Sequence, residues 1–294
     1  MNEKHILKLN DTEIGVYAKG AELFSYKVNG AEFIWERNPD FWGASSPVLF
    51  PFVGVIKREY YKYGNYEYHM PTRHGFARNY EFELSSRGED FLEFKFSSND
   101  ETLKIYPFKF DLYIKYTIEE NSLEIAYRVV NNTEGEMYFS IGAHPAFALE
   151  INDEISLRDY YLELEKNEEA KRIPLLDNGL AFGNNILSNF LEEENKIQLD
   201  EEIFEDDAII FENLESEKVA IKCSKSTRKV EMDFSGFPFI AFWSKPKAPF
   251  VCLEPWYGIT DFENSTGKLE NKKGILKLDK NSEFSAKFTI KAEL

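Results

Sequence analysis

Alternation of apolar and polar residues is the feature that most limits how this chain can fold. Every second residue is apolar in the runs 110–118, 123–129 and 284–292. Because successive side chains of a strand point to opposite faces of a sheet, each run predicts a strand with one face on a core and the other in water. Asn121 and Ser122, between the first two runs, predict a hairpin turn.

Long helical patterns are scarce in the rest of the chain. The segments 162–171 and 189–196 are both rich in charge, and we predict short helices or solvated loops there. The acidic stretch 191–207 is predicted to lie on the surface between strands. No linker and no internal repeat divides the sequence. We therefore predict an all-β protein, with one domain over residues 1–294 in which antiparallel sheets pack as a large sandwich.

Charge and composition exclude several classes of partner. The formal charge of −17, from 35 basic and 52 acidic residues, leaves no basic footprint for nucleic acid or for an anionic membrane surface. No apolar run approaches the roughly 20 residues that a membrane helix needs, and the first residues lack a signal-peptide core. Two cysteines without CxxC spacing fit the cytoplasm. A monomer and a homodimer are both compatible with this composition.

Histidine is scarce enough to guide a search for chemistry, since the chain has only four: His5, His69, His74 and His144. His5 lies near the terminus, and His69 lies in an alternating run where a strand-surface position is expected. His74 stands in RHGFAR (73–78), and His144 stands in SIGAHPAF (140–147). Either histidine alone is more often a hydrogen-bonded structural residue. Two of them in glycine-containing, loop-like settings favour a functional interpretation.

A third segment, FVCLEPWYG (250–258), is predicted as an apolar strand that ends in a carboxylate and then turns. Burial would raise the pKa of Glu254 and make it a better base, although a purely structural pairing explains it equally well. Trp256 can supply a stacking face for a ligand. Cys252 lies within the apolar run, where a small buried side chain is expected.

No metal or cofactor motif accompanies these segments. The histidines and cysteines show no ligand spacing such as HxxxH or CxxC. Walker, GxGxxG and GxSxG patterns are absent from the sequence as well. The sequence therefore predicts neither a bound metal nor a cofactor.

In these three segments the chain resembles the aldose 1-epimerase family, the galactose mutarotases, and most of all its LacX-like branch. The resemblance rests on HGFAR (74–78), GAHPAF (142–147) and CLEPW (252–256), in their order and wide spacing, and it spans nearly the whole chain. It implies the family's β-supersandwich fold. It also implies a small-molecule sugar substrate and a reaction that interconverts the α and β anomers of a free aldose.

The resemblance also implies roles for individual residues. Glu254 matches the general base that removes the proton of the C1 hydroxyl, and His144 matches the general acid that protonates the ring oxygen. His74 matches a histidine that hydrogen-bonds the sugar. Asp207 is the implied ligand of substrate hydroxyls, with Asp206 as the alternative. Each positioned proton transfer is worth about 10² to 10⁴ in rate, without a metal.

One departure from the family pattern leaves alternatives open. Mutarotases usually carry a sugar-binding arginine after the segment matching PFVG (51–54), where this chain has Val55. Arg58 and Arg78 are the expected substitutes. A hexose-6-phosphate 1-epimerase, with Arg58, Arg73 and Arg78 on the phosphate, is a second candidate. A non-catalytic carbohydrate-binding protein is a third.

Overall fold

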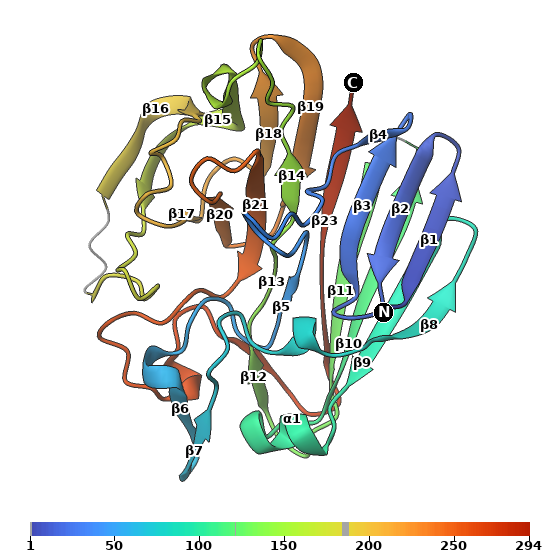
Figure 1. The fold of residues 1–294 in the computed structure, drawn as a ribbon. Helices are drawn as coiled ribbons and strands as arrows, with labels where there is room; N and C mark the ends of the chain where they lie inside the picture. The colour runs from blue at the N-terminus through green and yellow to red at the C-terminus, as the bar shows by residue number, and fades with distance from the viewer. Residues whose placement is uncertain (1, 121, 184–187) are drawn as a thin grey trace.

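Antiparallel strands dominate the computed structural model, which describes residues 2–120, 122–183 and 188–294. They form sheets of four, nine and six strands and two small two-stranded sheets (Figure 1). The four-stranded sheet contains β1 (Lys4–Leu9), β2 (Thr12–Tyr17), β3 (Glu22–Val28) and β4 (Ala31–Glu32). This arrangement confirms the predicted all-β supersandwich.

The nine-stranded sheet is the large layer at the back of the molecule in Figure 1. In spatial order it contains β16 (Ser188–Gln198), β15 (Tyr160–Arg172), β18 (Lys218–Cys223), β19 (Ser226–Asp233), β23 (Glu283–Glu293), β11 (Ser122–Asn131), β10 (Phe110–Glu119), β9 (Phe91–Ser97) and β8 (Glu83–Arg87).

The six-stranded sheet carries most of the residues singled out in the sequence. Its order is β17 (Ile209–Glu212), β20 (Phe239–Trp243), β21 (Phe250–Tyr257), β13 (Ile141–Ala143) and β5 (Val48–Leu49), and β14 (Ala146–Ala148) also pairs with β21. The small sheets pair β12 (Met137–Phe139) with β22 (Leu276–Leu278), and β6 (Tyr60–Tyr63) with β7 (Tyr66–His69).

Helices are few and short among the described residues: η1 (Lys57–Glu59), η2 (Ala77–Asn79), α1 (Asp100–Ile105), η3 (Leu157–Asp159) and η5 (Leu269–Asn271). The α1 turn begins at Asn99, whose side chain accepts hydrogen bonds from two backbone N–H groups of the first turn, as an N-cap does. In the described ranges, no helix has both the length and the apolar character that crossing a membrane requires.

The predicted hairpin is confirmed in its strands. β10 and β11 pair in register from Phe110 opposite Asn131 to Glu119 opposite Ser122, and β23 lies on the other side of β11. Ser122 thus opens β11 rather than forming the turn, and Asn121 lies outside the described residues. Alternate residues of both strands are buried, as a sheet with one core face requires.

The four-stranded and six-stranded sheets both pack on the core face of the nine-stranded sheet. The Tyr116 hydroxyl on β10 donates to the backbone carbonyl of Ala21, next to β3, at 2.7 Å. Phe284 of β23 meets Tyr257 of β21 edge-on, with ring centroids 5.0 Å apart. The nine-stranded sheet is therefore one layer, and the other two sheets share the second layer (Figure 1).

The helix-or-loop prediction for 162–171 and 189–196 is wrong. Both segments are strands, β15 and β16, which pair with each other across several register shifts at the end of the large sheet. β16 is the edge strand, and only Tyr160–Leu164 of β15 also pair with β18. Dense charge is typical of such a sheet edge, where Lys and Glu discourage pairing with another chain. The acidic stretch 191–207 likewise begins inside β16 and becomes a loop only beyond Gln198.

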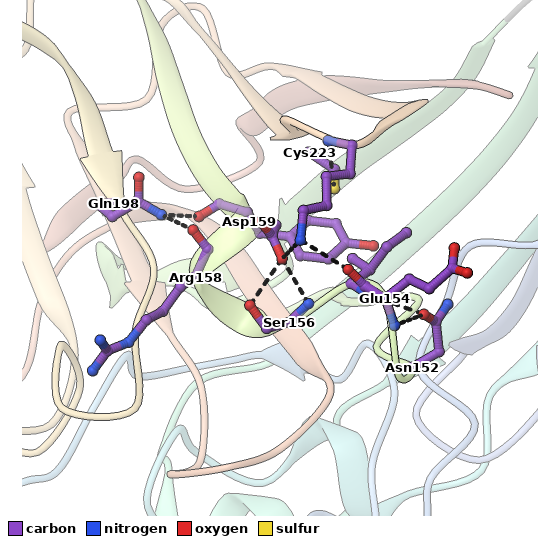
Figure 2. A network of polar contacts seen from close by, with 10 residues as sticks. Asn152, Glu154, Ser156, Arg158, Asp159, Gln198 and Cys223 are labelled. Atoms are coloured by element: carbon purple, nitrogen blue, oxygen red, sulfur yellow. Dashed lines mark hydrogen bonds and ion pairs between the residues drawn. The ribbon is translucent and has the colours of Figure 1, made fainter.

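Polar contacts fix the turn that leads into β15 (Figure 2). The Asp159 carboxylate accepts hydrogen bonds from the backbone N–H and hydroxyl of Ser156, both at 2.8 Å, and from Lys225 at 3.1 Å. Gln198 donates to the Arg158 carbonyl at 2.8 Å, which ties β16 to the same turn. Cys223 ends β18 beside this network.

Candidate active site

A cavity of about 430 Å³ beside the six-stranded sheet collects residues from all three sequence segments. The predicted site residues that line it are His74, Arg78, His144, Asp207, Glu254 and Trp256. Arg58 lies instead in a neighbouring hollow of about 220 Å³, beside Val55. Residues that the sequence did not single out as sugar contacts also line the main cavity: Phe41, Trp42, Arg73, Trp243 and Lys245.

Glu254 lies inside β21 rather than at its end, so the predicted turn at Pro255 is wrong. On one side β20 pairs with β21 without interruption past Glu254. On the other side β14 pairs as far as Cys252, and β13 takes over only at Trp256. Proline lacks the N–H that a central strand needs, and Pro255 falls in the gap between these two neighbours. His144 and Pro145 form the corner between β13 and β14, at that gap.

The gap places an imidazole against a buried carboxyl group. His144 Nε2 lies 3.4 Å from Glu254 Oε1, and the two side chains are 9% and 1% exposed. Among the described residues, His144 Nδ1 and Glu254 Oε2 are buried without a hydrogen-bond partner. Buried polar atoms are nearly always paired in native proteins, and these two unpaired atoms belong to side chains that line the cavity, where a ligand could pair with them.

Burial dominates the electrostatics of this pair. It raises the pKa of Glu254 well above its ordinary value; the nearby Asp207 carboxylate adds to this rise, and Arg73 opposes it. Burial also lowers the pKa of His144 to about 3, and the positive charge of Arg78 acts in the same direction. Both shifts favour an uncharged pair, a carboxylic acid beside a neutral imidazole, in the ligand-free protein.

Aromatic side chains fix the His144 ring. Trp42 stacks on its face with centroids 4.8 Å apart, and Trp243 meets it edge-on at 5.6 Å. The Trp42 carbonyl in turn accepts a hydrogen bond from the Trp35 indole at 2.8 Å. Because two tryptophans hold the ring, rotation of His144 away from Glu254 would cost packing on both sides.

His74 reaches the cavity from a strained turn. Its φ is +65° and that of Gly75 is +69°. A Cβ at position 75 would lie 2.3 Å from the Phe50 carbonyl oxygen, so only glycine fits there. Backbone N–H of Gly54 donates to His74 Nδ1 at 3.1 Å, and the His74 N–H donates back to the Gly54 carbonyl at 2.6 Å.

These contacts set the tautomer of His74. Since Nδ1 accepts a hydrogen bond, the ring proton of the neutral imidazole belongs on Nε2. Burial lowers the pKa of His74 well below its ordinary value, and the neighbouring His144 ring and the positive charges of Arg78 and Arg73 lower it further. His74 therefore presents a neutral ring that can donate one hydrogen bond through Nε2.

Arg73 and Asp207 form an ion pair at the edge of the cavity. Arg73 Nη2 lies 3.1 Å from Asp207 Oδ2, and the side chains are 43% and 29% exposed. A Cβ at Gly179 would lie 2.0 Å from the same Nη2, so this glycine makes room for the guanidinium. Asp206 points elsewhere, with its carboxylate 3.0 Å from Arg172. Of the two acids left open by the sequence, Asp207 is the one that lines the cavity.

Of the two arginines expected to replace the one missing at Val55, only Arg78 lines the main cavity. It also donates a hydrogen bond to the Arg73 carbonyl at 2.7 Å, which steadies the turn that carries His74. The sequence named Arg73 only as a possible phosphate ligand. The position of Arg73 next to His74 in RHGFAR could have suggested that it lines the same cavity. The sequence does not show, however, in which direction its side chain points.

A second buried ion pair supports the loops behind the cavity; we call it the Asp261 clamp. Lys272 Nζ donates to Asp261 Oδ1 at 2.7 Å, and the backbone N–H of Lys57 donates to Oδ2 at 2.9 Å. The Asp261 N–H in turn donates to the Val55 carbonyl at 3.0 Å. The clamp thus joins the segment after β5 to the segment after β21.

Comparison with known proteins gives a consistent result. The profile of the family described as Aldose 1-epimerase matches residues 5–277. The protein LacX of Lactococcus lactis subsp. lactis, plasmid form, is 33% identical over 269 residues, which cover 88% of this chain and 89% of that protein.

Solved structures agree with this similarity. A galactose mutarotase related enzyme from Lactobacillus acidophilus has a TM-score of 0.94 at 34% identity, covering 99% of this chain and 98% of that one. A galactose mutarotase-like protein from Lactobacillus casei has a TM-score of 0.93 at 26% identity, covering 99% of this chain and 100% of that one.

Proposed function

We propose that this chain, which belongs to the aldose 1-epimerase family, interconverts the α and β anomers of a free aldose. The observation that carries the proposal is the His144–Glu254 pair, 3.4 Å apart and unsatisfied at the floor of a cavity. Anomer exchange needs one proton removed from the C1 hydroxyl and one delivered to the ring oxygen. A carboxyl group and an imidazole side by side supply one site for each transfer.

In the proposed reaction Glu254 takes the C1 hydroxyl proton while His144 protonates the ring oxygen. The C1–O5 bond then breaks, the aldehyde group rotates about the C1–C2 bond, and the ring closes on its other face. Closure returns the ring-oxygen proton to His144 and the C1 proton from Glu254 to the sugar. The protein is therefore unchanged at the end of each turnover.

These roles require the proton of the pair to sit on His144, whereas burial favours the neutral arrangement. The two arrangements contain the same number of protons and differ only in which side chain holds one. Sugar hydroxyls that donate to the carboxylate would stabilise the charged arrangement. The charge of Arg73 lowers the pKa of Glu254, but it also lowers that of His144, so the sugar rather than this arginine is assigned the shift of the proton.

The remaining lining residues are proposed to orient the sugar. His74 Nε2–H is assigned to the ring oxygen. The Arg73–Asp207 pair and Arg78 are assigned to ring hydroxyls, so that Arg73 supplies the guanidinium that Val55 lacks. Trp256 donates its indole N–H to the Ala143 carbonyl at 3.2 Å, which leaves its ring as an apolar wall.

Polarimetry or NMR anomer exchange over a panel of free aldoses tests the proposal. Freshly dissolved α-glucose and α-galactose should reach anomeric equilibrium faster with the protein than without it. Saturable binding of a sugar with no acceleration for any member of the panel would instead indicate a carbohydrate-binding protein without catalysis.

A second candidate is a hexose-6-phosphate 1-epimerase. The observation that favours it is the presence of Arg73, Arg78 and Lys245 on the cavity lining, because guanidinium and ammonium groups bind phosphate. Rates on glucose and glucose 6-phosphate, compared under the same conditions, separate the two candidates. A strong preference for the phosphate would replace the first proposal.

A further inference from the structure

Cys252 is a buried nucleophilic group that the proposed mechanism does not use. It lies two residues before Glu254 on β21, so the two side chains lie on the same face of the strand. Its partner across the sheet is Ala146, two residues after His144. One ligand atom from each of His144, Cys252 and Glu254 lies within 4.8 Å of the others, and all three residues are buried.

Two of these side chains face each other through His144 Nε2 and Glu254 Oε1, and each carries a second polar atom that is unpaired. Glu254 Oε2 and His144 Nδ1 are buried without a hydrogen-bond partner in the described part of the chain. His144 and Glu254 also line the cavity, so a small ion can reach them from it. The neighbourhood thus combines three donors, unsatisfied atoms and a route of entry.

The donor set selects a class of cation. Thiolate, imidazole and carboxylate together are typical ligands of Zn²⁺, and Cd²⁺ shares the preference for sulfur, whereas Mg²⁺ and Ca²⁺ prefer oxygen ligands alone. We propose that His144, Cys252 and Glu254 form a three-ligand site for a thiophilic divalent cation, Zn²⁺ or Cd²⁺, whose binding blocks the acid–base pair.

The distances allow such a site after a small adjustment. Metal–ligand bonds of about 2.0–2.3 Å in a tetrahedral arrangement put ligand atoms about 3.3–3.8 Å apart. The 3.4 Å between His144 Nε2 and Glu254 Oε1 already falls in this range. The wider pairs of the group, up to 4.8 Å, need side-chain rotations that bring the atoms about 1 Å closer. The fourth position then faces the cavity.

Binding has a defined proton balance. The thiol of Cys252 loses its proton to solvent when the sulfur bonds the ion, and any proton on Glu254 is lost in the same way. His144 binds through a nitrogen lone pair that is then no longer free to carry a proton. The bound ion therefore occupies both groups that the sugar reaction requires.

Direct metal binding is the first arm of the test. Chelator-treated protein is titrated with Cd²⁺, monitored by the ultraviolet thiolate-to-cadmium charge-transfer band, and with Zn²⁺ in a calorimeter. We expect one equivalent bound by the native chain. The Cys252→Ser and Cys252→Ala variants should lose the charge-transfer band and bind at least about 100-fold more weakly.

The chain offers a matched control in its other cysteine. Cys223 is also buried and reduced, and it lies beside the turn drawn in Figure 2 rather than on the cavity lining. Cys223→Ser should keep the band and the affinity. A band that survives in the Cys252 variants but disappears in Cys223→Ser, or no band in the native chain, would overturn the proposed site.

Inhibition is the second arm, and it alone rests on the proposed mutarotase function. Cd²⁺ and Zn²⁺ should inhibit mutarotation by the native chain and by Cys223→Ser, competitively with sugar and reversibly with chelator. Both Cys252 variants should keep most of their activity and resist the ions. Equal inhibition of all forms would overturn the proposal. Cys252-dependent binding in a chain with no mutarotase activity would keep the metal site and refute the proposed function.

Discussion

The floor of the cavity and the Asp261 clamp are both buried pairs of a carboxyl group with a basic side chain, and they are built in opposite ways. In the clamp, each Asp261 oxygen has a donor, Lys272 at 2.7 Å and the Lys57 backbone at 2.9 Å. At the floor, Glu254 faces His144 at 3.4 Å, and its second oxygen has no partner among the described residues.

The difference is the one expected between a structural pair and the proposed reactive pair. A buried carboxylate that is fully hydrogen-bonded is locked, because any movement leaves a charge unpaired in a medium of low dielectric constant. A buried carboxyl group with a free oxygen raises the free energy of the ligand-free protein by an amount that a bound sugar hydroxyl can recover. We therefore expect folding to depend on the clamp, and we propose that the floor serves the reaction.

The largest expected effect is on rate at the floor. Glu254→Gln and His144→Ala should each reduce mutarotation about 10² to 10⁴-fold, the usual contribution of one positioned proton transfer. Both variants should stay folded, although His144→Ala also loses the ring contacts with Trp42 and Trp243. Polarimetry measures the rate and circular dichroism the fold. Unchanged rates in both folded variants would remove the proposed catalytic pair.

A substitution in the Asp261 clamp should lower stability rather than the rate of mutarotation. Lys272→Met leaves Asp261 buried without its cation, so the free energy of unfolding should fall by about 3–5 kcal/mol. Urea denaturation monitored by tryptophan fluorescence measures it. As a control, Lys245→Met removes an exposed lysine and should change stability little. A Lys272→Met protein as stable as the native one would break the contrast between the two regions.

Arg73 gives a smaller effect that bears on sugar recognition. Arg73→Ala removes a charged donor from the cavity, and kcat/KM should fall about 10- to 100-fold, corresponding to about 1.5–3 kcal/mol. The matched control is Arg58→Ala, since Arg58 lines the neighbouring hollow rather than the cavity. If Arg58→Ala is the more damaging change, Arg73 does not replace the arginine missing at Val55.

The smallest effect is a change in the shape of the pH profile. The pair keeps its single proton from the lowered pKa of His144, about 3, up to the raised pKa of Glu254. Below this window a second proton is bound, and above it the proton is lost. We expect kcat/KM to stay level through pH 4.5–6.5 and to fall only as pH rises through the raised pKa of Glu254. A profile that climbs steeply between pH 4.5 and 6.5 would contradict the neutral pair.

The same shift predicts a change in stability. Because the folded protein disfavours ionised Glu254, the contribution of this group to stability is full below its ordinary pKa and is lost as pH rises from there through its raised pKa. Glu254→Gln cannot ionise and should therefore lose less stability than the native chain on the alkaline side. Thermal melts of both proteins across that range measure the difference, and parallel curves would contradict the shift.

Many strands of the fold could be predicted from the sequence alone. Strands β10, β11 and β23 could be predicted because each buries one face and exposes the other. Apolar and polar residues therefore alternate along their sequences. The strands β15 and β16 were missed because the edge strand β16 and the half of β15 beyond Leu164, which pairs with β16 alone, are rich in Lys and Glu, and these charges hide the period of two.

At the site, the sequence determined which residues are present, and the motifs around His74, His144 and Glu254 were sufficient to expect them together. Tertiary structure decided the rest. It placed Arg73 rather than Arg58 on the main cavity, and it brought Cys252 close to His144 and Glu254. The physical reason is that a side chain's direction depends on the turn that carries it and on the space its neighbours leave. Gly179 makes room for Arg73, and the break beside Pro255 makes room for His144.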